Sequence, residues 1–331
     1  MPLLLTRRDV ESVLTMKEAI AAVEEGFKQL ALGKVTMPQR SAIRIPEEGG
    51  LHLTMPAHVG GDASGSLGAL AVKVVTVYPQ NPKRFGLPTI IGTLLLNDPR
   101  SGALLAIMDA GWLTAMRTGA ASGVATKYLA REDARTVGLF GAGVQARTQL
   151  MGVREVRPIR RVVVYDPVVE AAASLAAEME SRLSVAVETT AEPRTCLECD
   201  IVITASSSKT PVFDGRWLQP GTHINGVGSH SPDARELDSE TIRRCRIVVD
   251  QVEARLAEDA DLQIPLREGV ITQEHVQLSL GEVVAGLKPG RRDQEEITLF
   301  KSGGLAVQDA AAAARVYQLA LAAGIGHKID S

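Results

Sequence analysis

The stretch RTVGLFGAGVQARTQLMGVREVRPIRRVVVYD, residues 135–166, decides the fold of this chain. It opens with a short apolar run at residues 136–140, which ends in the glycine-rich turn GAGVQA at residues 141–146. A helical pattern of apolar residues follows, and then a β-branched run that closes on Asp166. Strand, glycine turn, helix, strand and terminal carboxylate is the order of a dinucleotide-binding βαβ unit.

The residues of this turn suit a dinucleotide for physical reasons. Gly141 permits a tight bend, Gly143 lets the backbone approach a pyrophosphate, and the small Ala146 lets the helix pack on the strand. The start of the helix offers free N–H groups and the positive end of a dipole to the phosphates. Asp166 can accept hydrogen bonds from an adenosine ribose and would repel a 2′-phosphate. We therefore expect NAD(H) as the cofactor, in preference to NADP(H).

The composition of the whole chain limits the class of protein. At 331 residues the chain can form one large or two ordinary domains, and its 45% hydrophobic and 23% charged content is that of a globular protein. A net charge of −3 argues against nucleic acid or an anionic membrane as the main partner. No apolar run approaches the length of a membrane span, and MPLLLTRRDV has no basic region before its leucines. We expect a cytoplasmic protein whose partner is a small molecule.

The three cysteines do not form a disulfide framework. Cys196 and Cys199 make a C-x-x-C just before the apolar residues 201–203, but no second pair completes a zinc site. The spacing of the histidines and carboxylates does not suggest a metal either. We expect no metal, and the role of the two thiols, redox or simply buried, stays open.

The residues before position 130 are strand-rich. Lys73 lies in the middle of an aliphatic strand, so it must either reach an edge or point into a polar cavity. Arg117 lies on a predicted helix at residues 109–129 whose face consists of small residues. A capping box predicts a helix from residue 15 to residue 32, and the strands, mostly antiparallel, are expected at residues 41–45, 51–55, 69–77, 89–96 and 103–108.

The residues after position 166 extend the parallel sheet. A helix is predicted at residues 168–183, and an alanine-rich helix at residues 306–323 can pack back on the first domain. The fold class is therefore α/β, with a Rossmann-type parallel-sheet nucleotide domain at residues 131–305. A strand-rich α+β domain comprises residues 1–130 and is joined by the C-terminal helix, residues 306–331. Further parallel strands are expected near residues 185–187 and at residues 200–205, 222–227 and 246–249.

Short motifs along the chain point to one family. They are MPA at 55–57, AVKVV around Lys73, LPT at 87–89, TAMRTGAASG around Arg117, GAGVQA at 141–146, INGVGSHSPDARELD at 224–238, LGE at 280–282 and FKSGGLAVQD at 300–309. With these motifs the chain resembles the ornithine cyclodeaminase/mu-crystallin family over nearly its full length.

The resemblance implies a homodimer in which the strand-rich domain carries the substrate and dimer contacts and the Rossmann domain carries the nicotinamide cofactor. Members of the family include cyclodeaminases, imino-acid reductases, alanine dehydrogenase-type enzymes and the hormone-binding mu-crystallin. Their shared chemistry is hydride exchange at the α-carbon of an amino acid, through an imine.

The resemblance also assigns roles to single residues. Arg44, Lys73 and Arg117 match positions that hold the substrate carboxylate, which guanidinium groups bind in bidentate fashion, and Met55 belongs to the same pocket. Lys73 could also donate a proton to the imine nitrogen. The positions that match cofactor contacts are Thr89, Arg117, Gly141, Gly143, Val144, Gln145, Asp166, Val227 and Ser302.

Two departures separate this chain from the cyclodeaminases. His230 stands where those enzymes carry an aspartate that acts in cyclisation, and Leu53 stands where an acidic residue meets the side-chain amine of ornithine. The segment at residues 227–232 is closer to the mu-crystallin and imine-reductase branch. His230 could be a catalytic acid near neutral pH or a loop histidine bonded to backbone, and both interpretations stay open.

The sequence therefore predicts an NAD(H)-dependent oxidoreductase, an imino acid reductase or amino acid dehydrogenase, that interconverts a small α-imino acid (a ketimine formed from a 2-oxo acid and an amine) and an L-amino acid. The alternatives are an ornithine- or lysine-type cyclodeaminase and a ligand-binding protein, similar to mu-crystallin, that retains NAD(P)H. The substrate's side chain, the physiological direction and the strictness of the preference for NAD over NADP stay open.

Overall fold

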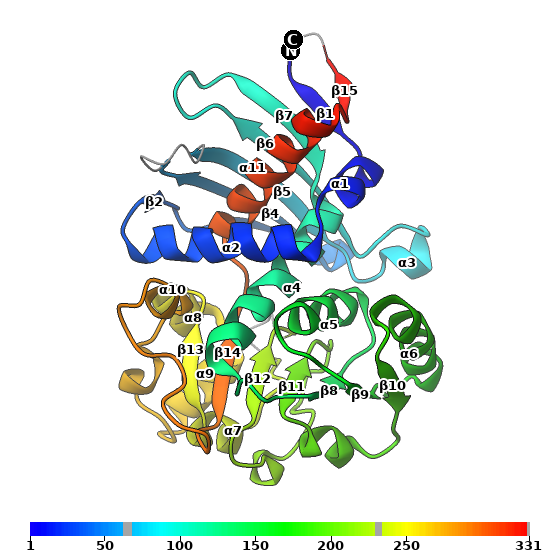
Figure 1. Cartoon of the computed structure of the whole chain (residues 1–331), viewed down its shortest axis with the longest axis vertical. Coiled ribbons are helices and arrows are strands. Elements are labelled where there is room, and N and C mark those ends of the chain that lie inside the picture. The colour runs from blue at the N-terminus through cyan, green and yellow to red at the C-terminus, as the bar shows by residue number, and fades with distance from the viewer. Residues whose placement is uncertain (62–67, 229–233, 330–331) are drawn as a thin grey trace. The chain divides into compact units, whose positions relative to one another are not determined.

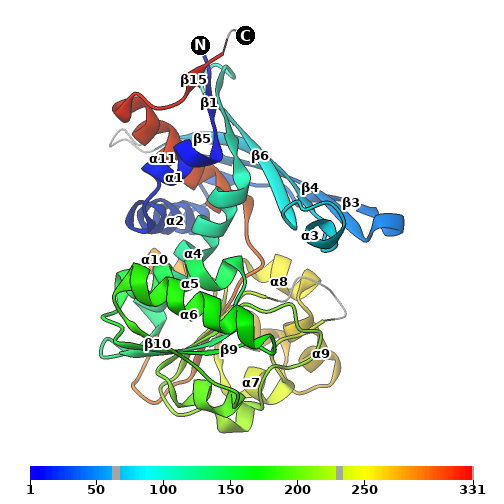
Figure 2. The ribbon, with the colours of Figure 1, turned by 90° about the vertical axis from the view of Figure 1, so that its right-hand side faces the viewer.

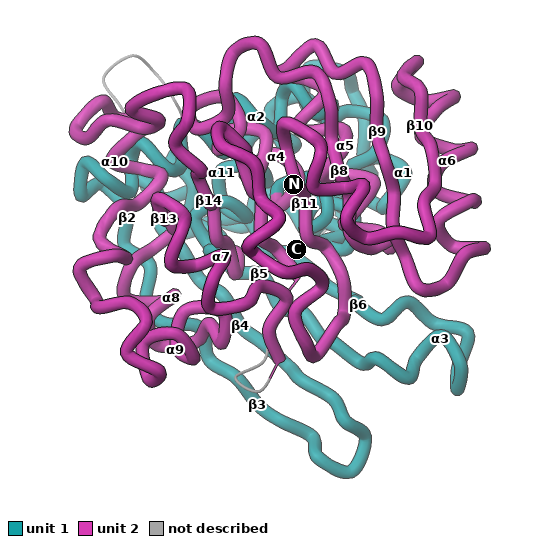
Figure 3. Tube along the Cα trace, turned by 90° about the horizontal axis from the view of Figure 1, so that it is seen from below, with its two compact units in different colours: residues 1–117, 305–331 teal, residues 118–304 magenta. Residues whose placement is uncertain are grey.

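The chain folds into two compact units (Figure 3). The predicted fold class, a parallel-sheet nucleotide domain and a separate strand-rich domain, is confirmed. Unit 1 comprises Met1–Arg117 and Leu305–Ser331, and unit 2 comprises Thr118–Gly304. This computed structural model describes residues 1–61, 68–228 and 234–329.

The division falls at Arg117, inside α4 (Ala110–Leu129), rather than after residue 130 where the sequence placed it. The reason is a close contact within unit 2. A Cβ on Gly119 would lie 2.2 Å from the carbonyl oxygen of Thr148, so the backbones of α4 and α5 (Val144–Val156) touch at this point. The second part of α4 therefore belongs to the nucleotide domain.

Unit 1 is built on an eight-stranded sheet in the order β15-β1-β7-β6-β5-β4-β2 (Figure 1). The remaining strand, β3, pairs with β4 (Figure 2). The ladders from β7 to β2 are antiparallel, as predicted, whereas β1 pairs with β7 in parallel. The elements of the sheet and its helices are β1 (Leu3–Leu5), α1 (Arg7–Val13), α2 (Met16–Ala31), β2 (Val35–Thr36), β3 (Ser41–Ile45), β4 (Gly50–Val59), β5 (Ala69–Val77), α3 (Asn81–Arg84), β6 (Ile90–Asn97), β7 (Leu104–Asp109), α11 (Ala306–Ala323) and β15 (His327–Lys328).

One face of this sheet packs against α1, α2 and α11, as Figures 1 and 2 show. Side chains alternate along β5, so Ala71, Lys73 and Val75 lie buried on that face. The alternate residues, among them Val72 and Val74, lie on the other face and are only partly buried. The alanine-rich α11 thus joins unit 1, as the sequence predicted.

Unit 2 is built on a seven-stranded parallel sheet in the order β10-β9-β8-β11-β12-β14-β13. The order reverses between β8 and β11, which is where nucleotides bind in such sheets. Its elements are β8 (Thr136–Phe140), α5, β9 (Arg161–Tyr165), α6 (Val169–Leu183), β10 (Ala186–Thr189), β11 (Ile201–Thr204), β12 (His223–Gly226), α7 (Ser239–Arg244), β13 (Arg246–Val249), α8 (Val252–Glu258), α9 (Ala260–Arg267), α10 (Leu280–Val284) and β14 (Thr298–Lys301).

Both faces of the parallel sheet are covered by apolar clusters. Val137 and Leu139 of β8 belong to the cluster that includes residues of α5 and α6. Phe140 belongs to a second cluster, which includes residues of α7 and α9. Coverage of both faces explains why the strands are continuous apolar runs in the sequence.

Candidate active-site residues

Lys73 lies in the middle of β5, on the face that packs against α11. Its side chain is 1% exposed, and its Nζ lies 2.7 Å from Oδ2 of Asp309 in α11. Its cross-strand neighbours, Met55 of β4 and Leu94 of β6, are both buried. The lysine therefore meets a carboxylate inside an otherwise apolar layer.

Arg117, predicted to bind the same substrate carboxylate, contacts the same aspartate. Its Nε donates to Oδ1 of Asp309 at 2.9 Å, and its Nη1 donates to Oε1 of Gln308 at 2.8 Å. Arg117 is 6% exposed and Asp309 is 1% exposed. Lys73 and Arg117, which are far apart in the sequence, are thus held by the two oxygens of one carboxylate.

The pKa of Lys73 reflects this environment. Burial lowers that pKa to about 8, because the ammonium is removed from water. The negative charge of Asp309 raises the same pKa, and the positive charges of Arg117 and Arg40 lower it. At pH 7 the ammonium is therefore still mostly protonated.

The structure places Arg40, rather than the predicted Arg44, near Lys73. Arg44 is exposed on β3 and pairs across the ladder with Leu51, four residues along β4 from Met55. At a rise of about 3.3 Å per residue, this separation is about 13 Å along the strand. Arg40, directly before β3, is half-buried and is close enough to act on the charge of Lys73. The pattern that could have identified it is the MPQR at residues 37–40.

Asp309 was missed by sequence reasoning, although it lies in the FKSGGLAVQD motif. The signal was an acidic residue in the first turn of a helix that is otherwise rich in alanine. Such a helix packs closely on its neighbours, and a carboxylate buried there needs a cation or several hydrogen-bond donors.

The glycine turn in unit 2 has the predicted geometry. Gly141 has a φ of 101°, and a Cβ there would lie 2.5 Å from the carbonyl oxygen of Ala205, so only glycine fits. Gly143 is the N-cap residue of α5 and makes no side-chain cap, which leaves the first N–H groups of the helix available to an anion. Val144, the first residue of the helix, is 64% exposed, and the adjacent Gln145 is partly buried.

Asp166 directly follows β9 and is fixed beside the glycine turn. Its Oδ2 accepts the backbone N–H of Ala142, and its Oδ1 accepts that of Val168, both at 2.8 Å. The carboxylate therefore lies where a dinucleotide fold carries the acidic group that binds the ribose.

Three other predicted cofactor positions follow or precede strands. Val227 follows β12 and Ser302 follows β14, its neighbour in the sheet, and both residues are buried. The Ser302 hydroxyl donates to Oδ2 of Asp250 at 2.9 Å. Thr89 precedes β6 in unit 1, and its carbonyl oxygen accepts the N–H of Tyr78 at 2.8 Å.

A buried ionic cluster in unit 2 holds the loops after β11, β12 and β14, and sequence reasoning did not find it. Glu236 accepts the backbone N–H groups of Ser206 and Gly228, at 2.7 Å and 2.8 Å. Burial lowers the pKa of Lys301, but the nearby carboxylates more than offset this and raise that pKa above its usual value. The members of the cluster, all buried, are Glu236, Asp250, Arg255, Asp259, Asp261 and Lys301.

The remaining predicted residues do not join these groups. His230 lies outside the described residues. Cys196 and Cys199 are free and buried, and burial raises their pKa to about 12 and about 11, so these thiols are unreactive at neutral pH.

Over residues 1–61, 68–228 and 234–329, no group of histidine, cysteine and carboxylate side chains is arranged to hold a metal ion. No helix of these residues is long and apolar enough to cross a membrane.

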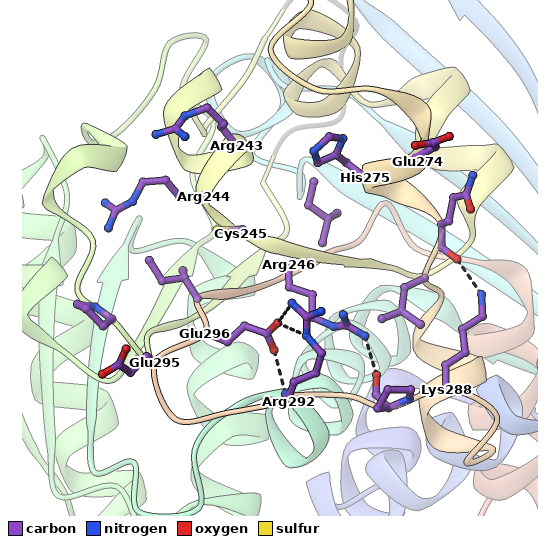
Figure 4. Close-up of a pocket in the computed structure, with 16 residues that line it drawn as sticks. Arg243, Arg244, Cys245, Arg246, Glu274, His275, Lys288, Arg292, Glu295 and Glu296 are labelled. Carbon is purple, nitrogen blue, oxygen red and sulfur yellow. Dashed lines mark hydrogen bonds and ion pairs between the residues drawn. The ribbon is translucent and has the colours of Figure 1, made fainter.

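A hollow of about 820 Å³ lies in unit 2, where β12, β13 and β14 begin (Figure 4). Because the strands are parallel, this is the edge opposite to the glycine turn, which follows the end of β8. Arg292 pairs with Glu296, and Lys288 pairs with Glu282, so carboxylates balance part of its positive charge. This hollow is therefore distinct from the predicted nucleotide site.

Known proteins with similar sequences and structures agree with this arrangement. Alanine dehydrogenase of Archaeoglobus fulgidus is 42% identical over 328 residues, 99% of this chain and 98% of that protein. The structure of Thermococcus litoralis Δ1-pyrroline-2-carboxylate reductase in complex with NADH and L-proline superposes with a TM-score of 0.94 at 48% identity, covering 99% of this chain and 100% of that one. An archaeal alanine dehydrogenase dimer with bound NAD gives a TM-score of 0.92 at 40% identity, covering 99% of both chains.

The family resemblance noted in the sequence is therefore confirmed. The sequence profile of the ornithine cyclodeaminase/mu-crystallin family matches residues 1–324. The close relatives are an alanine dehydrogenase and pyrroline-2-carboxylate reductases rather than ornithine cyclodeaminases. This chain belongs to the ornithine cyclodeaminase/mu-crystallin family.

Proposed function

We propose that this protein is an NAD(H)-dependent oxidoreductase that interconverts a small α-imino acid and the corresponding L-amino acid by hydride transfer. The observation that carries the proposal is the buried group of Lys73, Arg117 and Asp309. Its two cations and one anion leave a net positive charge, to which the nearby Arg40 adds, and a positive site suits a substrate that carries a carboxylate. The relatives named above, an alanine dehydrogenase and a reductase bound to NADH and L-proline, support this reaction class.

The residues of unit 1 would bind the substrate and supply its proton. When bound, NADH supplies the hydride that the imine carbon accepts. The electron pair of the C=N bond then moves to nitrogen, which must gain a proton. Lys73 suits that role because its pKa of about 8 leaves it protonated at neutral pH, yet able to give up the proton. Arg117 and Arg40 would hold the carboxylate.

The first experiment is an assay of NADH oxidation by the purified protein across a panel of 2-oxo acids. Each acid is tested with ammonia and with methylamine, beside preformed cyclic imines and iminosuccinate. Turnover of one subset is the expected result, and it would identify the side chain that the pocket accepts. If no compound of the panel caused NADH oxidation although fluorescence showed that NADH binds, the proposal would be contradicted. Cyclodeamination or ligand storage would then be favoured.

We also propose that NAD(H) is preferred over NADP(H). Asp166 places a negative charge beside the glycine turn, where a 2′-phosphate would be repelled. Residues 167–181, which follow it, contain no lysine or arginine to bind such a phosphate. The same panel, repeated with NADPH, is expected to give a lower kcat/KM for every substrate.

We propose that the protein is a homodimer, formed through the face of the unit 1 sheet opposite α11. That face presents aliphatic side chains that are half-buried or exposed, such as Val72, Leu95 and Ile107, and Ile91 is 43% exposed. An archaeal alanine dehydrogenase of the same fold is a dimer. Light scattering tests the dimer by measuring the mass of the protein in solution, and a monomeric mass would contradict the proposal.

We propose the cytoplasm as the location of the protein, because its cysteines are free and buried.

The assignment of Arg40 leads to a paired prediction. We expect Arg40→Met to raise KM for the imino acid at least about tenfold, because a charge that binds the carboxylate is lost. Arg44→Met removes an equal charge from the exposed β3 position and should change KM less than about twofold. Steady-state kinetics of the two variants compare them directly. The reverse order of effects would restore Arg44 as the binding residue.

A further inference from the structure

Asp309 is the residue on which the two predicted substrate-binding cations converge. Its Oδ2 lies 2.7 Å from Nζ of Lys73, and its Oδ1 accepts the Nε–H of Arg117 at 2.9 Å. Each oxygen serves one cation, and all three side chains are buried. The carboxylate therefore fixes the distance and orientation between an ammonium and a guanidinium.

A helix-capping role does not explain Asp309. It lies in the first turn of α11, where carboxylates often satisfy free backbone N–H groups. Here Oε1 of Gln308 accepts the N–H of Leu305 at 3.2 Å, and both oxygens of Asp309 point to side chains instead. The aspartate serves the two cations rather than the helix.

The electrostatics show why an anion is required. Two cations buried side by side repel each other, and each loses its hydration, so an uncompensated pair strongly disfavours the charged form of the lysine. Arg117 and Arg40 both lower the pKa of Lys73 by repulsion, and Asp309 raises it by attraction. The carboxylate is the group that keeps the lysine charged.

The other elements packed on β5 do not supply that charge. His52 and His58 of β4 point to the opposite face of the sheet, because they alternate with Met55, which pairs with Lys73. The sequence of β6, IIGTLLLN, contains no ionisable side chain. Arg315 of α11 pairs with Glu18 of α2.

We propose that Asp309 is a positioning residue that holds Lys73 and Arg117 together and keeps Lys73 protonated at neutral pH, so that the pair can bind a carboxylate and donate a proton. The inference rests on the proposed function, since it concerns the same site. It adds that Lys73, Asp309 and Arg117 form a triad in which one carboxylate fixes both cations and leaves the triad with a net positive charge for the substrate carboxylate.

The test is the pH dependence of kcat/KM for Asp309→Asn, which has the same shape but no charge. Without the anion the pKa of Lys73 falls, so the alkaline limb of the profile, expected near pH 8 in the wild type, should move to lower pH by about one to three units. At pH 7.5 the protonated fraction of Lys73 would then fall by about threefold for a shift of one unit and by about 200-fold for three units, and kcat/KM should fall with it. Asp309→Glu, which restores the charge, should return the limb toward its wild-type position.

A matched control is Glu18→Gln. Glu18 of α2 pairs with Arg315 of α11, the helix that carries Asp309, and the Glu18 carboxylate is far less buried than that of Asp309. We expect its pH profile to coincide with that of the wild type. If the limb of Asp309→Asn also coincided with the wild type while its rate fell, Asp309 would be a structural residue and the proposal would be wrong.

A thermal measurement separates this proposal from the proposed function. We expect Asp309→Asn to lower Tm, because two buried cations lose their anion, and Lys73→Met/Asp309→Asn to recover part of that loss. If the wild type turned over no imino acid, the proposed function would fail, but this comparison would still report whether Asp309 balances Lys73. A double variant less stable than Asp309→Asn would overturn the inference.

Discussion

Replacing Lys73 by methionine is expected to lower kcat for imine reduction at least about 10³-fold while leaving the Kd for NADH within about threefold. The methionine fills a similar volume in the apolar layer between Met55 and Leu94, so the fold should persist. Asp309 keeps Arg117 as its partner, and no buried anion is left alone. The loss would therefore report the missing proton donor and the missing charge for the carboxylate.

The measurement is steady-state turnover of the best substrate of the panel, with NADH binding followed by fluorescence. The control is Lys17→Met, since Lys17 is an exposed lysine of α2 in the same unit. Near-normal turnover of Lys73→Met would show that the proton comes from elsewhere, and the site assignment in unit 1 would then be wrong. A large loss of NADH affinity instead would give Lys73 a cofactor role.

Replacing Lys301 by methionine is expected to lower the free energy of unfolding by about 3–5 kcal/mol, the typical cost of removing one partner from a buried ionic group. Lys301 is fully buried, with Nζ 2.7 Å from Asp261 and 3.6 Å from Asp259. Without the ammonium these carboxylates stay buried with less compensation. Calorimetric Tm and urea unfolding measure the effect.

The pH dependence of this variant has a definite sign. Burial raises the pKa of Asp259 to about 6 in the wild type, and Lys301 opposes that rise. Without Lys301 the folded-state pKa rises further above the unfolded value. A folded state that binds protons more tightly is favoured at low pH and loses stability as pH rises through the folded pKa. Lys301→Met should therefore be more destabilised at pH 7.5 than at pH 5.

Two further variants make this prediction specific. Lys301→Met/Asp261→Asn removes the charge of the nearest carboxylate as well and should recover part of the loss. Arg161→Met breaks an ion pair with Glu188 in which both side chains are exposed, and it should cost less than about 1 kcal/mol. Equal effects of Lys301→Met and Arg161→Met would show that the buried cluster contributes no more than a surface pair.

Local sequence signals predicted much of the fold because their causes are local. The bend at Gly141 needs a positive φ, and Asp166 directly follows the next strand. All the signals that predict the βαβ unit therefore lie within residues 135–166. The alternation along β5 and the continuous apolar runs of the parallel strands also follow from which faces are covered. Pairings between distant segments were missed, such as the parallel contact of β1 with β7.

For the candidate site, the sequence supplied Lys73 and Arg117 singly, through motifs of the family, and chose Arg44 where the structure brings Arg40 near the lysine. Leu51, which pairs with Arg44, lies four residues along β4 from Met55, the neighbour of Lys73. This is a separation of about 13 Å, which a motif match does not register.

The sequence by itself determined the dinucleotide turn, the strand that carries Lys73, and the membership of the family. Only the tertiary structure decided that Asp309, 192 residues after Arg117 along the chain, joins that arginine to Lys73. It also decided that Lys301 compensates the carboxylates of unit 2. The physical reason is that ion pairing depends on distance and burial in space. Neither quantity is encoded in the neighbours of a residue along the chain.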